Sequence, residues 1–110
     1  MKRLDQETIL MWIAALRSGD YQHGKSALCQ DSKYCCLGVL YDIIGEEWVS
    51  ENDGYAWGHR AGEEGEVDYW DLPEDLKAEL GRHYPMLISM NDFWNADFNR
   101  IARYIEENIL

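Results

Sequence analysis

Apolar residues recur at helical spacing toward both ends of the chain. Residues 6–18 carry an apolar stripe, follow the candidate N-cap Asp5 and precede Gly19, so they predict an amphipathic helix. Residues 96–108 carry a second stripe and predict another helix, with Asn95 as its candidate N-cap. The two stripes consist of Ile9, Trp12, Ile13 and Leu16, and of Phe98, Ile101, Ala102, Ile105 and Ile109.

A dense apolar run at residues 34–44 predicts the buried spine of the fold. At helical spacing, one side of this run holds Cys36, Val39, Leu40, Ile43 and Ile44. Gly38 leaves room for a close neighbour, and Gly45 is a typical helix end. We therefore expect a helix over residues 35–44, with a strand as the alternative.

Residues 73–80 predict a further helix, because Pro73 and two acids occupy its first turn and Gly81 follows its end. The glycine-rich and acidic stretch between the second and third helices predicts short strands at 47–50 and 55–59, joined by a turn at 52–54. A small hairpin around 30–32 and a strand at 86–89 complete the expected sheet. The fold class is then α+β, with about four helices packed on a short antiparallel sheet.

Length and composition indicate one domain over residues 1–110, which is enough chain to bury its own core. The N-terminus lacks the pattern of a secretory signal, and the longest wholly apolar run, residues 9–16, is too short to span a bilayer. We expect a cytoplasmic protein. Its three cysteines are then reduced thiols, because an odd count that includes two neighbours makes a poor disulfide framework.

The net charge of -11 is concentrated in one part of the chain. Residues 46–79 hold twelve acids against two bases, whereas residues 1–45 are balanced with five of each. An acidic block of this kind repels nucleic-acid phosphates and attracts basic protein surfaces. Direct binding of nucleic acid is therefore disfavoured.

Residues 19–26 match the letters of the phosphate-binding pattern G-x-x-x-x-G-K-[ST]. That chemistry needs a buried strand before the loop and a helix starting at the lysine. Here the preceding segment predicts a helix, and turn formers follow soon after. We interpret these residues as a polar connection, with Gly19 as the cap of the first helix.

Thiol and imidazole groups are the remaining candidates for metal binding or catalysis. His23, Cys29, Cys35 and Cys36 lack the spacing of a C-x-x-C knuckle, so we expect no metal and no cofactor. A thiolate at the start of a helix could act as a nucleophile at Cys35 or Cys36. The base would be one of three residues without a local signature, namely His23, His59 and His83.

Several segments resemble a group of small proteins of unknown function carried by bacteriophages and prophages. These are the W-x-x-A-L-R-S-G-x-Y stretch at 12–21, the Y-C-C-L-G-V-L stretch at 34–40, Met90-Asn-Asp, and the helix from Phe98. The resemblance covers both ends of the chain and not its acidic middle. It implies a setting, an accessory protein acting inside an infected bacterium, and brings no reaction or catalytic residue.

Combined with the charge, this setting leads us to expect a non-enzymatic acidic phage protein that binds and inhibits a host protein with a basic surface. A defence component blocked by steric contact or by nucleic-acid mimicry would be one such target. Aromatic side chains inside an acidic surface are typical anchors of protein interfaces. The expected protein-binding residues are Glu46, Glu47, Trp57, Glu63, Glu64, Glu66, Asp68, Trp70 and Asp71.

Two other functions stay open on the sequence. The chain could sequester a nucleotide messenger through a modest basic neighbourhood with an aromatic ring to stack on the base. The residues for that function are Arg17, Tyr21, His23 and Lys25. The other possibility is a small cysteine-dependent enzyme.

Overall fold

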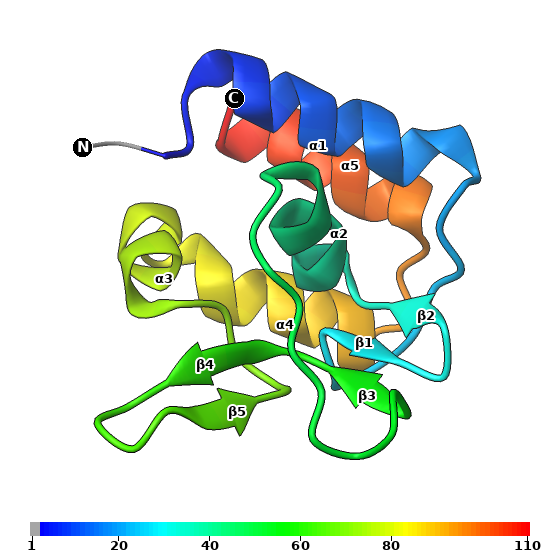
Figure 1. The fold of residues 1–110 in the computed structure, drawn as a ribbon. Helices are drawn as coiled ribbons and strands as arrows, with labels where there is room; N and C mark the ends of the chain where they lie inside the picture. The colour runs from blue at the N-terminus through cyan, green and yellow to red at the C-terminus, as the bar shows by residue number, and fades with distance from the viewer. Residues whose placement is uncertain (1–2) are drawn as a thin grey trace.

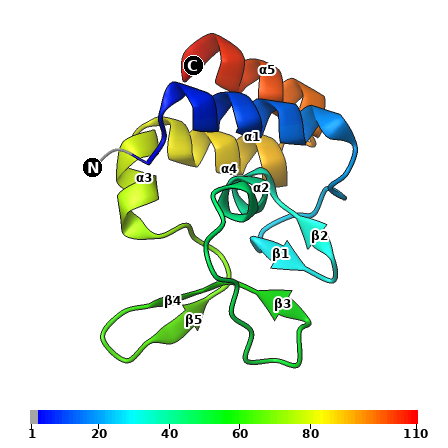
Figure 2. The same ribbon diagram turned by 45° about the horizontal axis from the view of Figure 1, so that its top comes forward.

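The computed structural model describes residues 3–110, and in it the helices from the two ends of the chain pack against each other. Helix α1 spans Gln6–Ser18 and helix α5 spans Phe98–Asn108, and they lie side by side in both views (Figures 1 and 2). The side chain of Asp5 accepts a 2.8 Å hydrogen bond from the Thr8 amide, and Gly19 ends α1 at φ 80°. The predicted first helix and both of its caps are confirmed.

The last helix starts two residues later than predicted, and its predicted N-cap is wrong. Asp97 is the N-cap, and its carboxylate accepts a 2.8 Å hydrogen bond from the Arg100 amide. Asn95 has φ 53°, in the left-handed region, whereas Asp97 has the extended backbone (φ -74°, ψ 172°) that an N-cap requires. Asn95 instead lies in the connection that leads into α5.

Helix α2, Cys36–Ile43, crosses the interior beneath α1 and confirms the predicted spine. The indole of Trp12 donates a 2.9 Å hydrogen bond to the carbonyl of Cys36, which ties α1 to the first turn of α2. A Cβ placed on Gly38 would lie 1.9 Å from the carbonyl oxygen of Leu28, so only glycine fits where these backbones meet. The expected close neighbour of Gly38 is therefore the Leu28 backbone.

Helix α3 spans Glu74–Leu80, as predicted, but the strand expected at 86–89 is wrong. That segment lies inside a helix, α4, which spans His83–Asp92. Pro85 is the third residue of α4, where the amide it lacks would have no partner within the helix. The buried residues Tyr84, Leu87, Met90 and Asn91 recur at helical spacing.

A three-stranded antiparallel sheet has the order β2-β1-β3, with β1 at Cys29–Gln30, β2 at Lys33–Tyr34 and β3 at Ala56–Trp57. Strands β1 and β2 form the predicted hairpin. Its two turn residues, Asp31 and Ser32, have φ of 54° and 63°, the pattern of a two-residue hairpin turn.

The pairing predicted for the acidic middle is mostly wrong. Val49 and Gly58 form one isolated antiparallel bridge, but β3 pairs with β1 instead of with 47–50. His59–Ala61 forms β4, which pairs with Glu66–Asp68, β5, in a second hairpin that projects away from the helices (Figures 1 and 2). These strands are two or three residues long. Their pairing therefore depends on contacts with segments that are distant in sequence.

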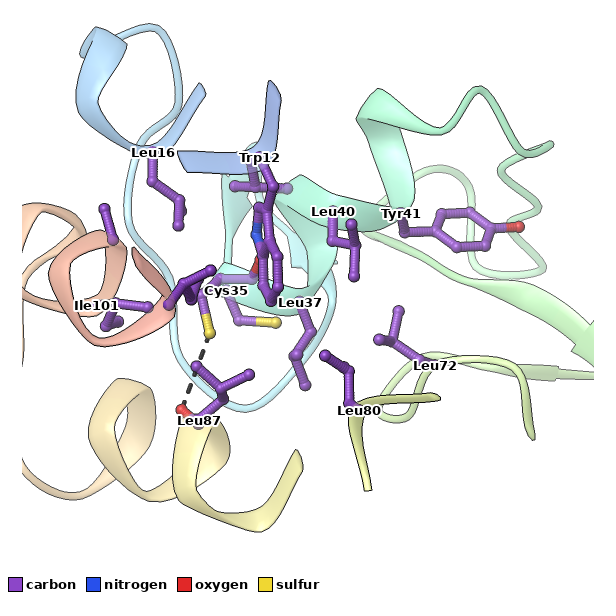
Figure 3. Packing of buried hydrophobic residues seen from close by; sticks show 14 of the residues in the cluster. Trp12, Leu16, Cys35, Leu37, Leu40, Tyr41, Leu72, Leu80, Leu87 and Ile101 are labelled. Atoms are coloured by element: carbon purple, nitrogen blue, oxygen red, sulfur yellow. Dashed lines mark hydrogen bonds between the residues drawn. The ribbon is translucent and has the colours of Figure 1, made fainter. Parts of the chain in front are cut away.

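The five helices share one hydrophobic core, against which Tyr34 of β2 also packs, and the chain is a single α+β domain as expected. Figure 3 shows Trp12 from α1, Leu37 and Leu40 from α2, Leu87 from α4 and Ile101 from α5 directed into the same interior. Within residues 3–110, no helix is long and apolar enough to cross a membrane.

Candidate functional site

A buried asparagine joins the segments that surround the first candidate site. Asn91, at the end of α4, is 1% exposed. Its carbonyl oxygen accepts a 3.0 Å hydrogen bond from the Cys36 amide and lies 2.7 Å from Nε2 of His23. Its amide nitrogen donates to the carbonyl of Gly24 over 3.0 Å and to Asp92 over 2.8 Å. One side chain thus fixes the 19–28 connection against the ends of two helices.

The next residue, Asp92, carries a carboxylate at the same junction. Its Oδ1 accepts hydrogen bonds of 2.8 Å from both the Ser26 amide and the Asn91 side chain. Both donors are neutral, and across residues 3–110 no ion pair includes Asp92. The negative charge of this carboxylate is therefore not compensated by a basic side chain of the described chain.

A pocket of about 230 Å³ opens at this junction, and we name it the Trp70 pocket. Its apolar lining comes from the start of α2 and from Ile88 of α4. Its polar lining comes from Ser26, Trp70, Asp71, Asn91 and Asp92. The pocket combines an indole ring, an apolar wall and two carboxylates.

The turn after β5 holds Trp70 at the surface. Oδ1 of Asp68 accepts the backbone amides of Trp70 and Asp71 over 2.9 and 3.0 Å, the pattern of an Asx turn. The hydroxyl of Tyr84 donates a 2.9 Å hydrogen bond to Asp71, which fixes that carboxylate in turn. Burial, together with this carboxylate partner, raises the pKa of Tyr84. The indole of Trp70 remains 56% exposed beside a fixed negative charge.

A second pocket, of about 320 Å³, has mostly aromatic walls, and we name it the Trp57 pocket. It is lined by Cys29, Ser32, Tyr34, Trp48 and Trp57. The rings of Tyr34 and Trp48 meet edge to face at 6.0 Å. Behind them, Asp42 accepts the Trp48 indole over 2.9 Å and the Tyr21 hydroxyl over 2.5 Å. The two tryptophans expected as anchors therefore border two different pockets.

The acids expected to bind protein fall into two groups instead of one continuous patch. Glu63, Glu64 and Glu66 are exposed on the β4–β5 hairpin. Asp68 and Asp71 belong to the Trp70 turn described above. Glu46 pairs with Arg3 near the start of α3, and Glu47 is exposed beside it in sequence. The acids of the hairpin and of the Trp70 turn are separate from those near Arg3.

The residues expected to bind a nucleotide do not line either pocket, and each contacts another part of the described chain. Arg17 pairs with Glu106 at 3.2 Å, and Tyr21 donates to Asp42. His23 binds Asn91 and stacks on Phe98 with ring centroids 4.2 Å apart, while Lys25 donates to Asn95. The 19–26 connection leads into strand β1 instead of a helix, which removes the structural context that a phosphate-binding loop needs.

The thiols expected as possible nucleophiles are buried. Burial raises the pKa of Cys35 to about 12 and that of Cys36 well above its ordinary value. Cys36 contacts the carbonyl of Leu87 at 3.8 Å, and Cys35 accepts the Gly38 amide as the N-cap of α2. The three histidines bind Asn91, the Asp71 carbonyl and the Tyr104 hydroxyl. Among residues 3–110, no three metal-ligating side chains gather at one point.

Sequence reasoning did not identify Ser26, Asn91 and Asp92 as parts of a site. Asn91 lies at helical spacing from the buried residues Tyr84 and Leu87, which would mark it as a buried polar side chain. The predicted strand at 86–89 concealed this spacing. Ser26 appeared in the phosphate-loop pattern and contributes its backbone amide to a carboxylate instead.

These features define a small α+β domain with one pocket where the 19–28 connection meets α2 and α4, another pocket on the three-stranded sheet, and an acidic hairpin. The chain belongs to the family described as a domain of unknown function, DUF8296, which matches residues 4–109. The comparisons with curated proteins and with solved structures found no match.

Proposed function

We propose that this chain is a non-enzymatic phage accessory protein that binds and inhibits a host protein with a basic surface in the bacterial cytoplasm. The observation that carries the proposal is the Trp70 turn, where Asp68 fixes the backbone and a half-exposed indole lines a pocket together with Asp71 and Asp92. An exposed tryptophan supplies a large contact area, and the entropic cost of ordering it is small because its side chain has only two rotatable bonds. The phage setting comes from the resemblance of its segments to phage and prophage proteins.

The acidic hairpin supports the same function through long-range attraction. Glu63, Glu64 and Glu66 are exposed, and they form no ion pair within residues 3–110. Such charges accelerate association with a basic surface, and they do so less at high salt. The host target, for example a defence component, would then be blocked by direct contact or by occupation of its nucleic-acid groove.

The pockets and thiols favour a protein partner over the two other functions. Pockets for drug-sized ligands usually measure roughly 300–1,000 Å³. The Trp70 pocket is smaller than that, and it is lined by carboxylates that repel phosphate. The Trp57 pocket, at about 320 Å³, reaches this range, but no lysine or arginine of residues 3–110 lines it to hold a phosphate. Cys35 and Cys36 are buried and held as neutral thiols, whereas a cysteine nucleophile needs an accessible thiolate.

A tagged pull-down from bacterial lysate at low and high salt tests the proposal. We expect one host protein to be retained at low salt and lost at high salt. After its identification and purification, the association rate with the variant Glu63→Lys, Glu64→Lys, Glu66→Lys should fall at least about tenfold at low salt.

The control reverses three exposed acids on the helical surface, Glu7, Glu106 and Glu107, which changes the net charge equally. It also removes the ion pairs of Glu106 with Arg17 and of Glu107 with Arg103, so its thermal unfolding is measured alongside. This variant should keep most of the association rate, because its charges lie away from the proposed interface. An equal loss of association rate in both variants would mean that net charge alone, and not the hairpin, causes the effect. Retention of no protein at either salt concentration would overturn the proposed function.

A further inference from the structure

The Trp70 pocket has the chemistry of a receptor for one planar cation. Its wall is apolar where Leu37 and Ile88 line it, and its rim carries the Trp70 indole. Two carboxylates, Asp71 and Asp92, line it as well. We infer that this pocket binds an arginine side chain presented by the partner's basic surface, an inference that rests on the proposed function.

The described chain contacts both carboxylates through neutral donors. Asp71 accepts the Tyr84 hydroxyl at 2.9 Å, and Asp92 accepts the Ser26 amide and the Asn91 side chain. Within residues 3–110, neither carboxylate forms an ion pair. Lys25, which precedes the pocket residue Ser26, donates a hydrogen bond from its ammonium group to Asn95. A guest cation would therefore meet two oriented negative charges that no residue of the described chain neutralises.

The hydrogen bonds that hold these carboxylates also preorganise the pocket. Asp92 follows Asn91, whose side chain is buried and fully bonded, and Asp71 is fixed by both Tyr84 and the Asx turn of Asp68. Within residues 3–110, each carboxylate accepts these hydrogen bonds through Oδ1, which leaves Oδ2 for a guest. Preorganised acceptors bind a cation without the entropic cost of ordering flexible side chains.

Arginine fits this combination better than other guests. A guanidinium is planar, stacks on an indole face and donates paired hydrogen bonds to carboxylates. Its methylene stem would lie along the apolar wall. A pocket of about 230 Å³ holds a single side chain, and its carboxylates repel a phosphate or a second carboxylate. A metal ion is disfavoured, because no three ligating side chains converge within the described residues.

Titration of the purified protein with N-acetyl-arginine methylamide tests the inference without the host partner. The readout is the indole N–H resonance of Trp70 in a spectrum of ¹⁵N-labelled protein. We expect a saturable shift of this resonance with arginine and none with the citrulline analogue, which has the same shape and no charge. N-acetyl-lysine methylamide should bind at least about fivefold more weakly, since an ammonium cannot form the planar stack.

Variants locate the binding. Asp92→Asn retains an oxygen for Ser26 and Asn91 but removes the charge, and it should weaken arginine binding about fivefold. Trp70→Leu should abolish the response of a second reporter, the backbone amide of Asp71. The control Trp94→Leu removes another exposed tryptophan, 60% exposed, that does not line the pocket, and it should change nothing.

No shift at tens of millimolar arginine would overturn the inference, as would equal binding of citrulline or of lysine. An unchanged affinity in Asp92→Asn, with the same thermal unfolding as the parent protein, would also overturn it. If the probe fails while a host protein is still retained in the pull-down, the arginine pocket is wrong and the proposed function stands. If the probe binds while the pull-down retains nothing, the pocket stands and the proposed function fails.

Discussion

The helical part of the chain and its acidic middle differ in what their side chains do. Helices α1, α2, α4 and α5 supply most of the buried residues of the core. Within residues 46–71, all of which the structure describes, the buried side chains are those of Ala56 and His59. The helices therefore account for stability, whereas the acidic middle is free to carry charge and exposed aromatic rings. Binding function can then change there at little cost to folding.

The largest effect should come from truncating a core residue of the helical part. Leu40→Ala, in the fully buried centre of α2, should lower the free energy of unfolding by about 3–4 kcal/mol. Val67→Ala, in the half-buried hairpin, should lower it by less than about 1 kcal/mol. Urea unfolding followed by circular dichroism measures both. Similar losses in the two variants would show that the hairpin belongs to the stabilising core.

A slightly smaller loss should follow from removing the buried amide at the pocket. Asn91→Leu leaves the Cys36 amide and the Gly24 carbonyl without their partner, which should cost about 2–3 kcal/mol. The control His23→Ala removes one neighbour of Asn91 and should cost less. Unfolding of Asn91→Leu within about 0.5 kcal/mol of the parent would contradict the role of this residue as the link between α2, α4 and the 19–28 connection.

Alkaline pH should weaken the helical part through its buried thiol. Burial raises the pKa of Cys35 to about 12 from an ordinary value of 9.0, so the unfolded chain loses this proton first. Stability is therefore fully present below pH 9 and falls as the pH rises from 9 toward 12. Chemical unfolding at pH 7, 9 and 10.5 measures the slope. Cys35→Ser should reduce the slope without abolishing it, because the pKa of Cys36 is raised as well. An unchanged slope would assign the alkaline loss to Cys36 and to buried tyrosines such as Tyr84.

Burial of the two thiols should also slow their chemical modification at neutral pH. Cys35 and Cys36 should react with a thiol reagent far more slowly than the same thiols in the unfolded chain. The reaction rate should rise with urea in parallel with unfolding. Rapid modification of either thiol in the native protein would reopen the cysteine-dependent enzyme.

The smallest effect on stability should come from the hairpin charges. Glu63→Gln, Glu64→Gln and Glu66→Gln together should change the free energy of unfolding by about 0.5 kcal/mol or less, because these side chains are exposed. The variant should still associate more slowly with a basic partner at low salt. A large loss of stability would mean that the hairpin acids support the fold, and the separation of the two regions would be wrong.

Helices with local signals were predictable from the sequence alone. Residues 6–18 carry their own stripe and caps, and residues 36–43 carry a dense apolar run that ends before Gly45. The information for these helices lies within a few turns of chain. Helix α4 was missed because Pro85 and the polar residues Ser89 and Asn91 interrupt its apolar pattern, and its burial depends on contacts with α2.

The sequence by itself determined both caps of α1, the apolar stripes of α1, α2 and α5, the β1–β2 hairpin turn and the acidic block, because each depends on residues close together in the chain. Tertiary structure alone decided the partner of β3, since two-residue strands carry too little pattern to select one. It also decided the Trp70 pocket, which joins Ser26, Trp70 and Asp92. Residues so far apart in the chain become neighbours only when the helices pack, and no local spacing records that contact.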